Sequence, residues 1–196
     1  LPPGQHGIAG YAFRNPVGGG YLNALTWEPG LSALDVQPRL TAFERLARQG
    51  VTLTSVSPAR FAGTGLTECA LRGARFHPVP DEDDHPARIQ WTADGAASGE
   101  KALVYLYERS LDHTGHGMGW QTEHWRAALR RIDAMVRDLR DALPDDVRLL
   151  VTGDHGMIDS PQDRWVIAED VPHLLDDITL VAGEGRFRQF YCDRRH

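Results

Sequence analysis

Two short clusters of the sequence combine a carboxylate with an imidazole. Asp112 and His116 stand at the two ends of the run DHTGH, and Asp154 and His155 are adjacent in GDHG. Carboxylate oxygen and neutral imidazole nitrogen are good ligands for zinc and also suit manganese or iron, whereas calcium prefers an all-oxygen shell. Two such ions about 4 Å apart can hold a phosphate and stabilise both the attacking and the leaving oxygen. These residues therefore predict a centre for two divalent metal ions, with zinc favoured, that hydrolyses phosphate esters.

The elements that must position these clusters are indicated by the surrounding pattern. Residues 102–107, ALVYLY, are typical of a strand covered on both faces, and residues 147–152, VRLLVT, form a second apolar run. Between them, residues 124–143 repeat apolar side chains along one stripe, which predicts a long amphipathic helix. Strand, helix and strand predict a right-handed βαβ unit, in which both clusters follow the carboxyl ends of parallel strands at one sheet edge.

The pairing of the residues carries more weight than any one of them. A single Asp or His in a loop is more often solvated, or part of a helix cap, than a metal ligand. Two Asp/His pairs, each directly after an apolar run, are much harder to obtain by accident. Gly115, Gly153 and Gly156 flank the ligands, where the absence of a Cβ would allow tight turns. The four acids at 81–84 lack the spacing of a calcium loop and are interpreted as a solvated turn.

The remaining sequence predicts elements of both kinds, and therefore an α/β fold class with a mostly parallel sheet sandwiched by helices. The expected elements are a loop rich in Gly and Pro over 1–30, a helix over 38–49, a strand over 51–57, a short helix over 65–73 and a hairpin within 179–196.

Composition limits the partners. The formal net charge is −6, so no long-range positive field gathers a nucleic-acid polymer, and the expected partner is a small-molecule phosphate ester. No stretch approaches the roughly 18 uninterrupted apolar residues of a membrane span. Cys69 and Cys192 are too far apart in sequence to indicate a disulfide framework or a metal knuckle. The cell compartment and the oligomeric state are not indicated by the sequence.

A family resemblance enters through the same residues. LDHTGHGMG resembles the D-x-x-G-H metal motif, and VTGDHGM the D-H-G-M motif, of the nucleotide pyrophosphatases/phosphodiesterases in the alkaline phosphatase superfamily. The opening LPPGQHGIAGY is similar to the Y-P-x-x-H-G-I segment of that family, so three motifs occur in family order. The resemblance implies an alkaline-phosphatase-like α/β fold, with residues 1–196 as a single partial catalytic domain that is incomplete at both ends.

The resemblance also assigns roles. It implies that Asp112 and His116 bind one metal ion, that Asp154 and His155 bind the other, and that a Thr or Ser bridging the metals attacks phosphorus. The resemblance further implies that this nucleophile and an early Asp ligand lie upstream of Leu1, and that a final His ligand lies after residue 196. The first residue is Leu rather than Met, which is in keeping with a missing start. The fragment by itself is therefore expected to be a poor enzyme. His6, in the H-G-I match, is interpreted as loop architecture.

Two alternatives stay open at this point. The same metal frame could serve a phosphomonoesterase, a phosphonate hydrolase or a sulfatase, because the frame does not specify the leaving group. The chain could also be a non-catalytic pseudoenzyme module that only holds phosphate. The D-H-G-M motif favours a phosphodiesterase acting on nucleotide-type small molecules. Comparing the hydrolysis of sulfate and phosphate esters tests the first alternative, and measuring the metal content of the chain tests the second.

Overall fold

The computed structural model describes residue 8 and residues 10–192 of the chain. His6 lies outside the described residues. Contacts divide the chain into two compact units, the first made of Leu1–Ala42, Gly63–Arg72 and Pro161–His196, and the second of Phe43–Ala62 and Gly73–Ser160. The single partial domain over 1–196 stays a prediction.

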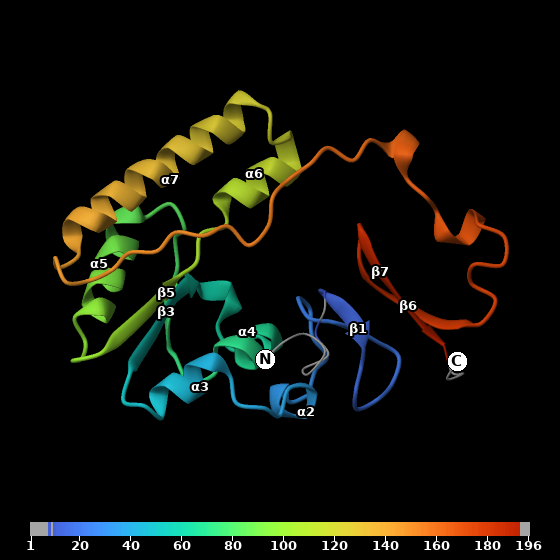
Figure 1. Cartoon of the computed structure of the whole chain (residues 1–196), viewed down its shortest axis with the longest axis horizontal. Coiled ribbons are helices and arrows are strands. Elements are labelled where there is room, and N and C mark those ends of the chain that lie inside the picture. Colours follow the sequence, from blue (N-terminus) through green and yellow to red (C-terminus); the bar gives the residue numbers. More distant parts are fainter. Residues whose placement is uncertain (1–7, 9, 193–196) are drawn as a thin grey trace. The chain divides into compact units, whose positions relative to one another are not determined.

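The second unit is built on a three-stranded parallel sheet with the order β4-β3-β5 (Figure 1). Its central strand is buried from Leu53 onward, as expected for a strand that has a neighbour on each side. The sequence prediction of a strand over 51–57 is confirmed. The strands are β3 (Thr52–Pro58), β4 (Arg75–Val79) and β5 (Ala102–Leu106).

Helices lie against both faces of this sheet. A Cβ added at Gly95 of α5 would stand 3.0 Å from Val104, while the next residue of β5, Tyr105, meets the ring of Phe43 in α3 edge-on with centroids 6.4 Å apart. Successive side chains of a strand point to opposite faces, so these two helices cover opposite sides. The predicted α/β class, a parallel sheet flanked by helices in the alkaline-phosphatase-like manner, is confirmed. The helices are α3 (Ala42–Ala47), η1 (Ala59–Phe61), α5 (His85–Ala96), α6 (Ser110–Met118) and α7 (Glu123–Ala142).

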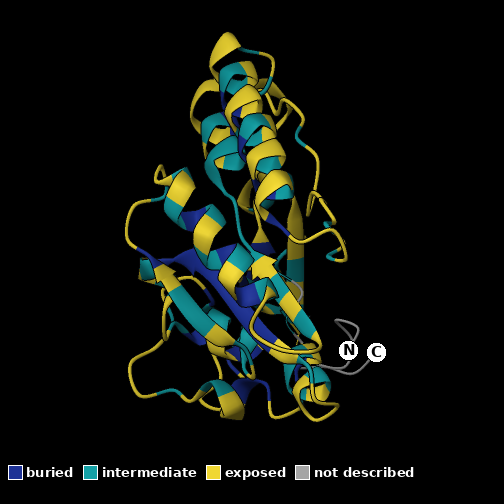
Figure 2. Cartoon of the chain, turned by 90° about the vertical axis from the view of Figure 1, so that its left-hand side faces the viewer, coloured by how far each residue is buried: buried dark blue, intermediate teal, exposed yellow. Residues whose placement is uncertain are grey.

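The long helix α7 confirms the prediction over 124–143. The Thr122 hydroxyl caps it by accepting the Trp125 N–H at 3.3 Å. Its buried residues are Ala128, Met135 and Leu139, and the exposed positions lie on the other side of the helix (Figure 2). This helix packs against α5 and α6.

The prediction of a second strand over 147–152, which would complete the βαβ unit, is wrong. Residues 147–152 are irregular, and Leu150 and Val151 are 81% and 70% exposed. The guanidinium of Arg140 donates to the carbonyl of Val147 at 2.6 Å and also to those of Leu143 and Pro144. These bonds hold the chain against the end of α7. The first carbonyl of the apolar run is therefore bonded to an arginine side chain and not to a neighbouring strand.

The prediction that 102–107 forms a buried strand is also wrong. Among the described residues β5 pairs with β3 alone, so it is an edge strand, and Leu103 and Tyr105 are 43% and 40% exposed. The sequence pattern does not predict β4, α5 or the hairpin at the start of the chain. Neither apolar alternation nor a wide apolar stripe marks these segments.

The first unit contains two antiparallel hairpins and short helices around a core of Phe13, Leu22, Ala24, Val36 and Cys69. The predicted hairpin within 179–196 is confirmed as β6 and β7, and the predicted helix over 65–73 as α4. The elements are β1 (Ala12–Arg14), β2 (Tyr21–Asn23), α2 (Ala33–Val36), α4 (Gly65–Leu71), η2 (Gln162–Arg164), η3 (Ala168–Asp170), β6 (Ile178–Glu184) and β7 (Phe187–Cys192). None of the described helices combines the length and apolar character that a membrane crossing requires.

Candidate metal centre

The first Asp/His pair lies on α6, which is separated from the end of β5 by three residues. Asp112 and His116 are four residues apart on this helix, so they share one face, and the Asp112 Oδ1 is 3.3 Å from the His116 Nε2. The helix ends at Gly119, whose φ of 85° lies in the region that favours glycine. The pair is thus held on a regular element and not on a loop.

The second pair lies in the irregular segment that follows 147–152. The His155 backbone N–H donates to the Asp154 Oδ1 at 2.9 Å, and the His155 Nδ1 is 3.0 Å from the Gly156 carbonyl oxygen. A carbonyl oxygen only accepts hydrogen bonds, so this contact puts a proton on Nδ1. In the neutral ring the lone pair is then on Nε2, as in a metal-binding histidine whose other nitrogen is held by a backbone carbonyl.

The two pairs meet at the carboxylate of Asp112. The His155 Nε2 is 3.9 Å from the Asp112 Oδ1 and 3.7 Å from the Asp154 Oδ2. The Asp112 Oδ1 is itself buried and has no hydrogen-bond partner among the described residues. Burying a carboxylate oxygen without such a partner costs free energy because the oxygen loses its hydration. A cation bound at this position would offset that cost. The side chains of the two pairs therefore approach one another at the Asp112 carboxylate, although the segment before His155 is not a strand.

The arrangement is open. The side chains of Asp112 and His116 are 43% and 70% exposed, and those of His155 and Asp154 are 51% and 73% exposed. Within the described part of the chain, no three or more His, Cys, Asp or Glu side chains form a group that could already hold a metal ion. The ligand roles of these four residues stay a prediction.

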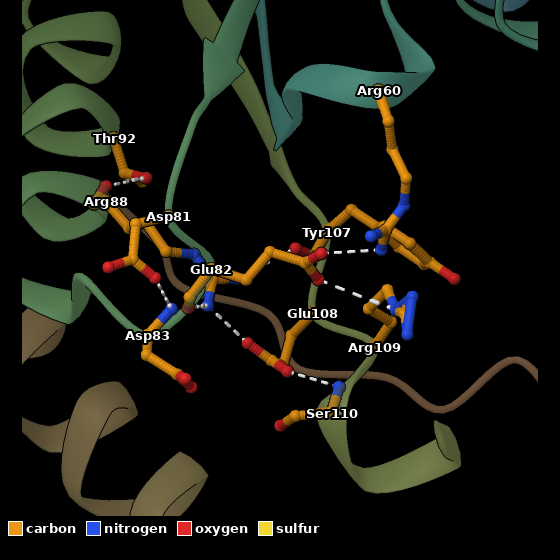
Figure 3. A network of polar contacts seen from close by, with 10 residues as sticks. All are labelled: Arg60, Asp81, Glu82, Asp83, Arg88, Thr92, Tyr107, Glu108, Arg109 and Ser110. Atoms are coloured by element: carbon orange, nitrogen blue, oxygen red, sulfur yellow. Dashed lines mark hydrogen bonds and ion pairs between the residues drawn. The ribbon is translucent and has the colours of Figure 1, made fainter.

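A buried ion pair fixes the junction between β5 and α6 (Figure 3). The Arg88 Nη1 of α5 is 2.5 Å from the Glu108 Oε2, with 3% and 16% of the two side chains exposed. The Glu108 Oε1 accepts the backbone N–H of Ser110, the first residue of α6, at 2.6 Å. Burial alone would raise the pKa of the Glu108 carboxyl, but the hydrogen bonds from Ser110 and the charge of Arg88 outweigh it and hold that pKa below its usual value.

The acidic run at 81–84 contributes to the same junction. The Glu82 carboxylate pairs with Arg60 at 2.5 Å and with Arg109 at 3.5 Å, and the Glu82 carbonyl oxygen accepts from Arg88 at 2.9 Å. The Asp84 carboxylate caps α5 by accepting the Ala87 N–H at 3.0 Å. The run is therefore more than a solvated turn. An Asp followed by His-Pro at the start of α5 is a helix-start signal by which this helix can be recognised in the sequence.

The pKa of the Tyr105 phenol on β5 is shifted by two effects. Burial raises the pKa of its phenol, and the negative charge of Asp154 raises that pKa further. The Tyr105 phenol is therefore protonated at neutral pH.

Comparison with known proteins agrees with the motifs. The sequence model described as "Type I phosphodiesterase / nucleotide pyrophosphatase" matches residues 1–196. Ectonucleotide pyrophosphatase/phosphodiesterase family member 7 of Rattus norvegicus is 28% identical over 102 residues, which are 50% of this chain and 23% of that protein. The Homo sapiens protein of the same name is 28% identical over 123 residues, 60% of this chain and 27% of its own. GPI ethanolamine phosphate transferase 3 of Schizosaccharomyces pombe is 29% identical over 93 residues, 47% of this chain and 10% of its own.

The matched part of this chain thus spans about a quarter or less of the length of these curated relatives. The family model covers every residue of the chain. The chain belongs to the type I phosphodiesterase/nucleotide pyrophosphatase family.

Proposed function

We propose that this chain carries the metal centre of a hydrolase that cleaves phosphodiester or pyrophosphate bonds in nucleotide-type small molecules. Asp112, His116, Asp154 and His155 would hold two divalent metal ions, with zinc favoured and manganese or iron also suited to the ligands. The observation that carries this proposal is the buried Asp112 Oδ1, which has two imidazole nitrogens within 3.9 Å and no hydrogen-bond partner among the described residues.

The distances between the proposed ligand atoms support this assignment. Two ligands that each lie about 2.0–2.1 Å from one tetrahedral ion are about 3.3 Å apart. The Asp112 Oδ1 and the His116 Nε2 already have this separation, 3.3 Å. The His155 Nε2 is 3.7 Å from the Asp154 Oδ2, so a modest closure of the exposed second pair would bring it to the same spacing. The donor atoms present therefore fit the proposed ions.

Each residue has a distinct task in this proposal. The backbone of Asp112 and His116 is held by α6, and His155 is oriented because its Nδ1 is held by the Gly156 carbonyl. Bound divalent ions would stabilise negative charge on the phosphate oxygens. The attacking hydroxyl is expected from a Thr or Ser upstream of Leu1, which is why the extended protein, and not these 196 residues, is expected to be the efficient catalyst.

Metal binding provides the first test. Zinc or manganese binding is measured by isothermal titration on the 196-residue chain and on the variants His155→Ala and Asp112→Asn. Each variant should lose about tenfold or more in affinity, at least the loss that removal of an outer-shell partner causes. His113→Ala is the matched control, because His113 is an exposed histidine of the same helix. Equal affinity in His155→Ala and His113→Ala would refute the ligand assignment.

Hydrolysis provides the second test. With zinc or manganese present, a chain extended at both ends should turn over a chromogenic phosphodiester, while the 196-residue chain should do so weakly or not at all. Phosphomonoesters and sulfate esters run in parallel distinguish the related hydrolases. Faster cleavage of a sulfate ester would contradict the proposed substrate class, and equal turnover by both chains would contradict the upstream nucleophile.

A further inference from the structure

Gly115 lies in the middle of α6, between the two proposed ligands of that helix. Glycine is among the poorest helix formers, and Gly115 does not belong to the described glycines with positive φ. The turn expected from the sequence is therefore not the reason for a glycine here. Its reason is space: a Cβ at Gly115 would overlap the sulfur of Met157 and stand 2.7 Å from its methyl carbon.

The lack of space for a Cβ is specific to Gly115, as Gly117 shows. It belongs to the same helix, two residues further on, and a Cβ added there would have nothing within 4 Å. At Gly115 the indole ring of Trp125 also borders the site, with its Cδ1 3.4 Å from the added Cβ. Gly115 and Trp125 thus form a seat on the helical side of the unit, and the Met157 side chain occupies it.

Met157 is the inward-facing residue of the segment that carries the second pair. Within residues 150–160, all of which the structure describes, it is the one residue that is not exposed. Asp159 adds a weaker tether, because its exposed carboxylate accepts from the Gln121 side chain at 3.1 Å. The contact of Met157 therefore helps to hold this irregular segment against α6.

We infer that the seating of Met157 on Gly115 positions Asp154 and His155 against Asp112, and so sets the spacing between the two halves of the metal centre. Met157 follows His155 by two residues, so a displaced methionine would move the imidazole with it. An unbranched thioether side chain fills such an irregular space well, and a packed contact transmits displacements of this size. Both are positioning residues, and the inference rests on the proposed metal-binding function.

The test compares Gly115→Ala with Gly117→Ala in the 196-residue chain. Helix propensity favours alanine at both positions, so a purely local effect predicts equal behaviour. If Met157 must be seated, Gly115→Ala should weaken zinc binding about tenfold or more, the range seen when a residue that orients a ligand is lost. Gly117→Ala should stay within about twofold of the wild type. Combining Gly115→Ala with Met157→Ala should restore part of the loss, because the shorter side chain removes the overlap.

A readout without metal separates the packing from the chemistry. With the methionine methyl groups labelled with ¹³C, the Met157 methyl should show a nuclear Overhauser effect to the Gly115 α-protons in the wild type and in Gly117→Ala. In Gly115→Ala its shift should move toward that of an exposed methionine. If Gly115→Ala does not fold, Met157→Ala carries the test, since it removes the contact without an overlap and should also weaken zinc binding.

The outcomes are distinct. Zinc affinity in Gly115→Ala that equals that of Gly117→Ala, or strictly additive losses in the double variant, would overturn the inference while leaving the metal centre intact. Absence of the Overhauser effect in a folded wild-type chain would do the same. A seated Met157 in a chain that binds no zinc or manganese would instead overturn the proposed function, and the positioning role with it.

Discussion

Arg88 and Glu108 form a buried ion pair, 2.5 Å between the Nη1 and the Oε2, at the point where β5 gives way to α6. Arg88 also donates to the carbonyl oxygens of Glu82 and Tyr107, each at 2.9 Å. A guanidinium from α5 therefore satisfies a side chain and two backbone carbonyls at the exit of the edge strand. The helix with Asp112 and His116 begins from this fixed point.

Removing one partner of this pair should be costly. Arg88→Met leaves the Glu108 carboxylate buried without its cation, so the free energy of unfolding should fall by about 3 kcal/mol, in line with other broken buried pairs. Urea denaturation followed by circular dichroism measures this loss. The matched control is Arg137→Met, because Arg137 forms an exposed pair with Asp133 at 3.0 Å and should change stability by about 0.5 kcal/mol or less. Similar losses in the two variants would contradict the role given to Arg88.

The stability that Glu108 contributes should depend on pH. Its folded-state pKa lies below the unfolded value of about 4.3, so the contribution is present above that value and is lost as the pH falls through the folded pKa. Glu108→Gln cannot ionise, and it should be less stable than the wild type at pH 7. The difference in unfolding free energy should shrink as the pH is lowered toward 3. A difference that is constant over this range would show that charge is not the cause.

Asp84 should contribute through its helix cap. Asp84→Ala removes the acceptor of the Ala87 N–H at the start of α5 and should lower the free energy of unfolding by about 1 kcal/mol. Asp83→Ala is the neighbouring control, an exposed acid that is expected to cost about 0.5 kcal/mol or less. Thermal unfolding of the two variants side by side measures the difference. If Asp83→Ala costs as much as Asp84→Ala, net charge rather than capping explains the loss.

The two cysteines should react at different rates. Burial raises the pKa of the Cys69 thiol to about 11, with Arg72 opposing and Glu68 adding to the shift, whereas Cys192 is exposed. Iodoacetamide at neutral pH should therefore label the native chain at Cys192 first, and Cys69 only in urea. Mass spectrometry of peptides locates the label, and Cys192→Ser should react slowly until it unfolds. Rapid native labelling of Cys69 would contradict the packing of the first unit's core.

The sequence alone identified the features that depend on neighbouring residues. The 3.6-residue apolar repeat predicted α7, the β-rich runs predicted β3 and β5, and the paired carboxylates and imidazoles selected Asp112, His116, Asp154 and His155. These patterns are local because helix faces, strand propensity and ligand chemistry are properties of a short stretch of chain. The family motifs are local for the same reason, and the family model agrees with them.

The tertiary structure decided what depends on partners distant in sequence. An apolar run becomes a strand only when a neighbouring strand pairs with its backbone. In VRLLVT the carbonyl of Val147 instead accepts from the guanidinium of Arg140, and the run is irregular. Gly115 was expected to serve a turn, but a side chain from 42 positions further along the chain fills the space it leaves. Glu82 was interpreted as solvated, but two arginines from other elements reach it. Composition and periodicity cannot encode such contacts, because they arise only when packing brings separate segments into van der Waals and hydrogen-bonding range.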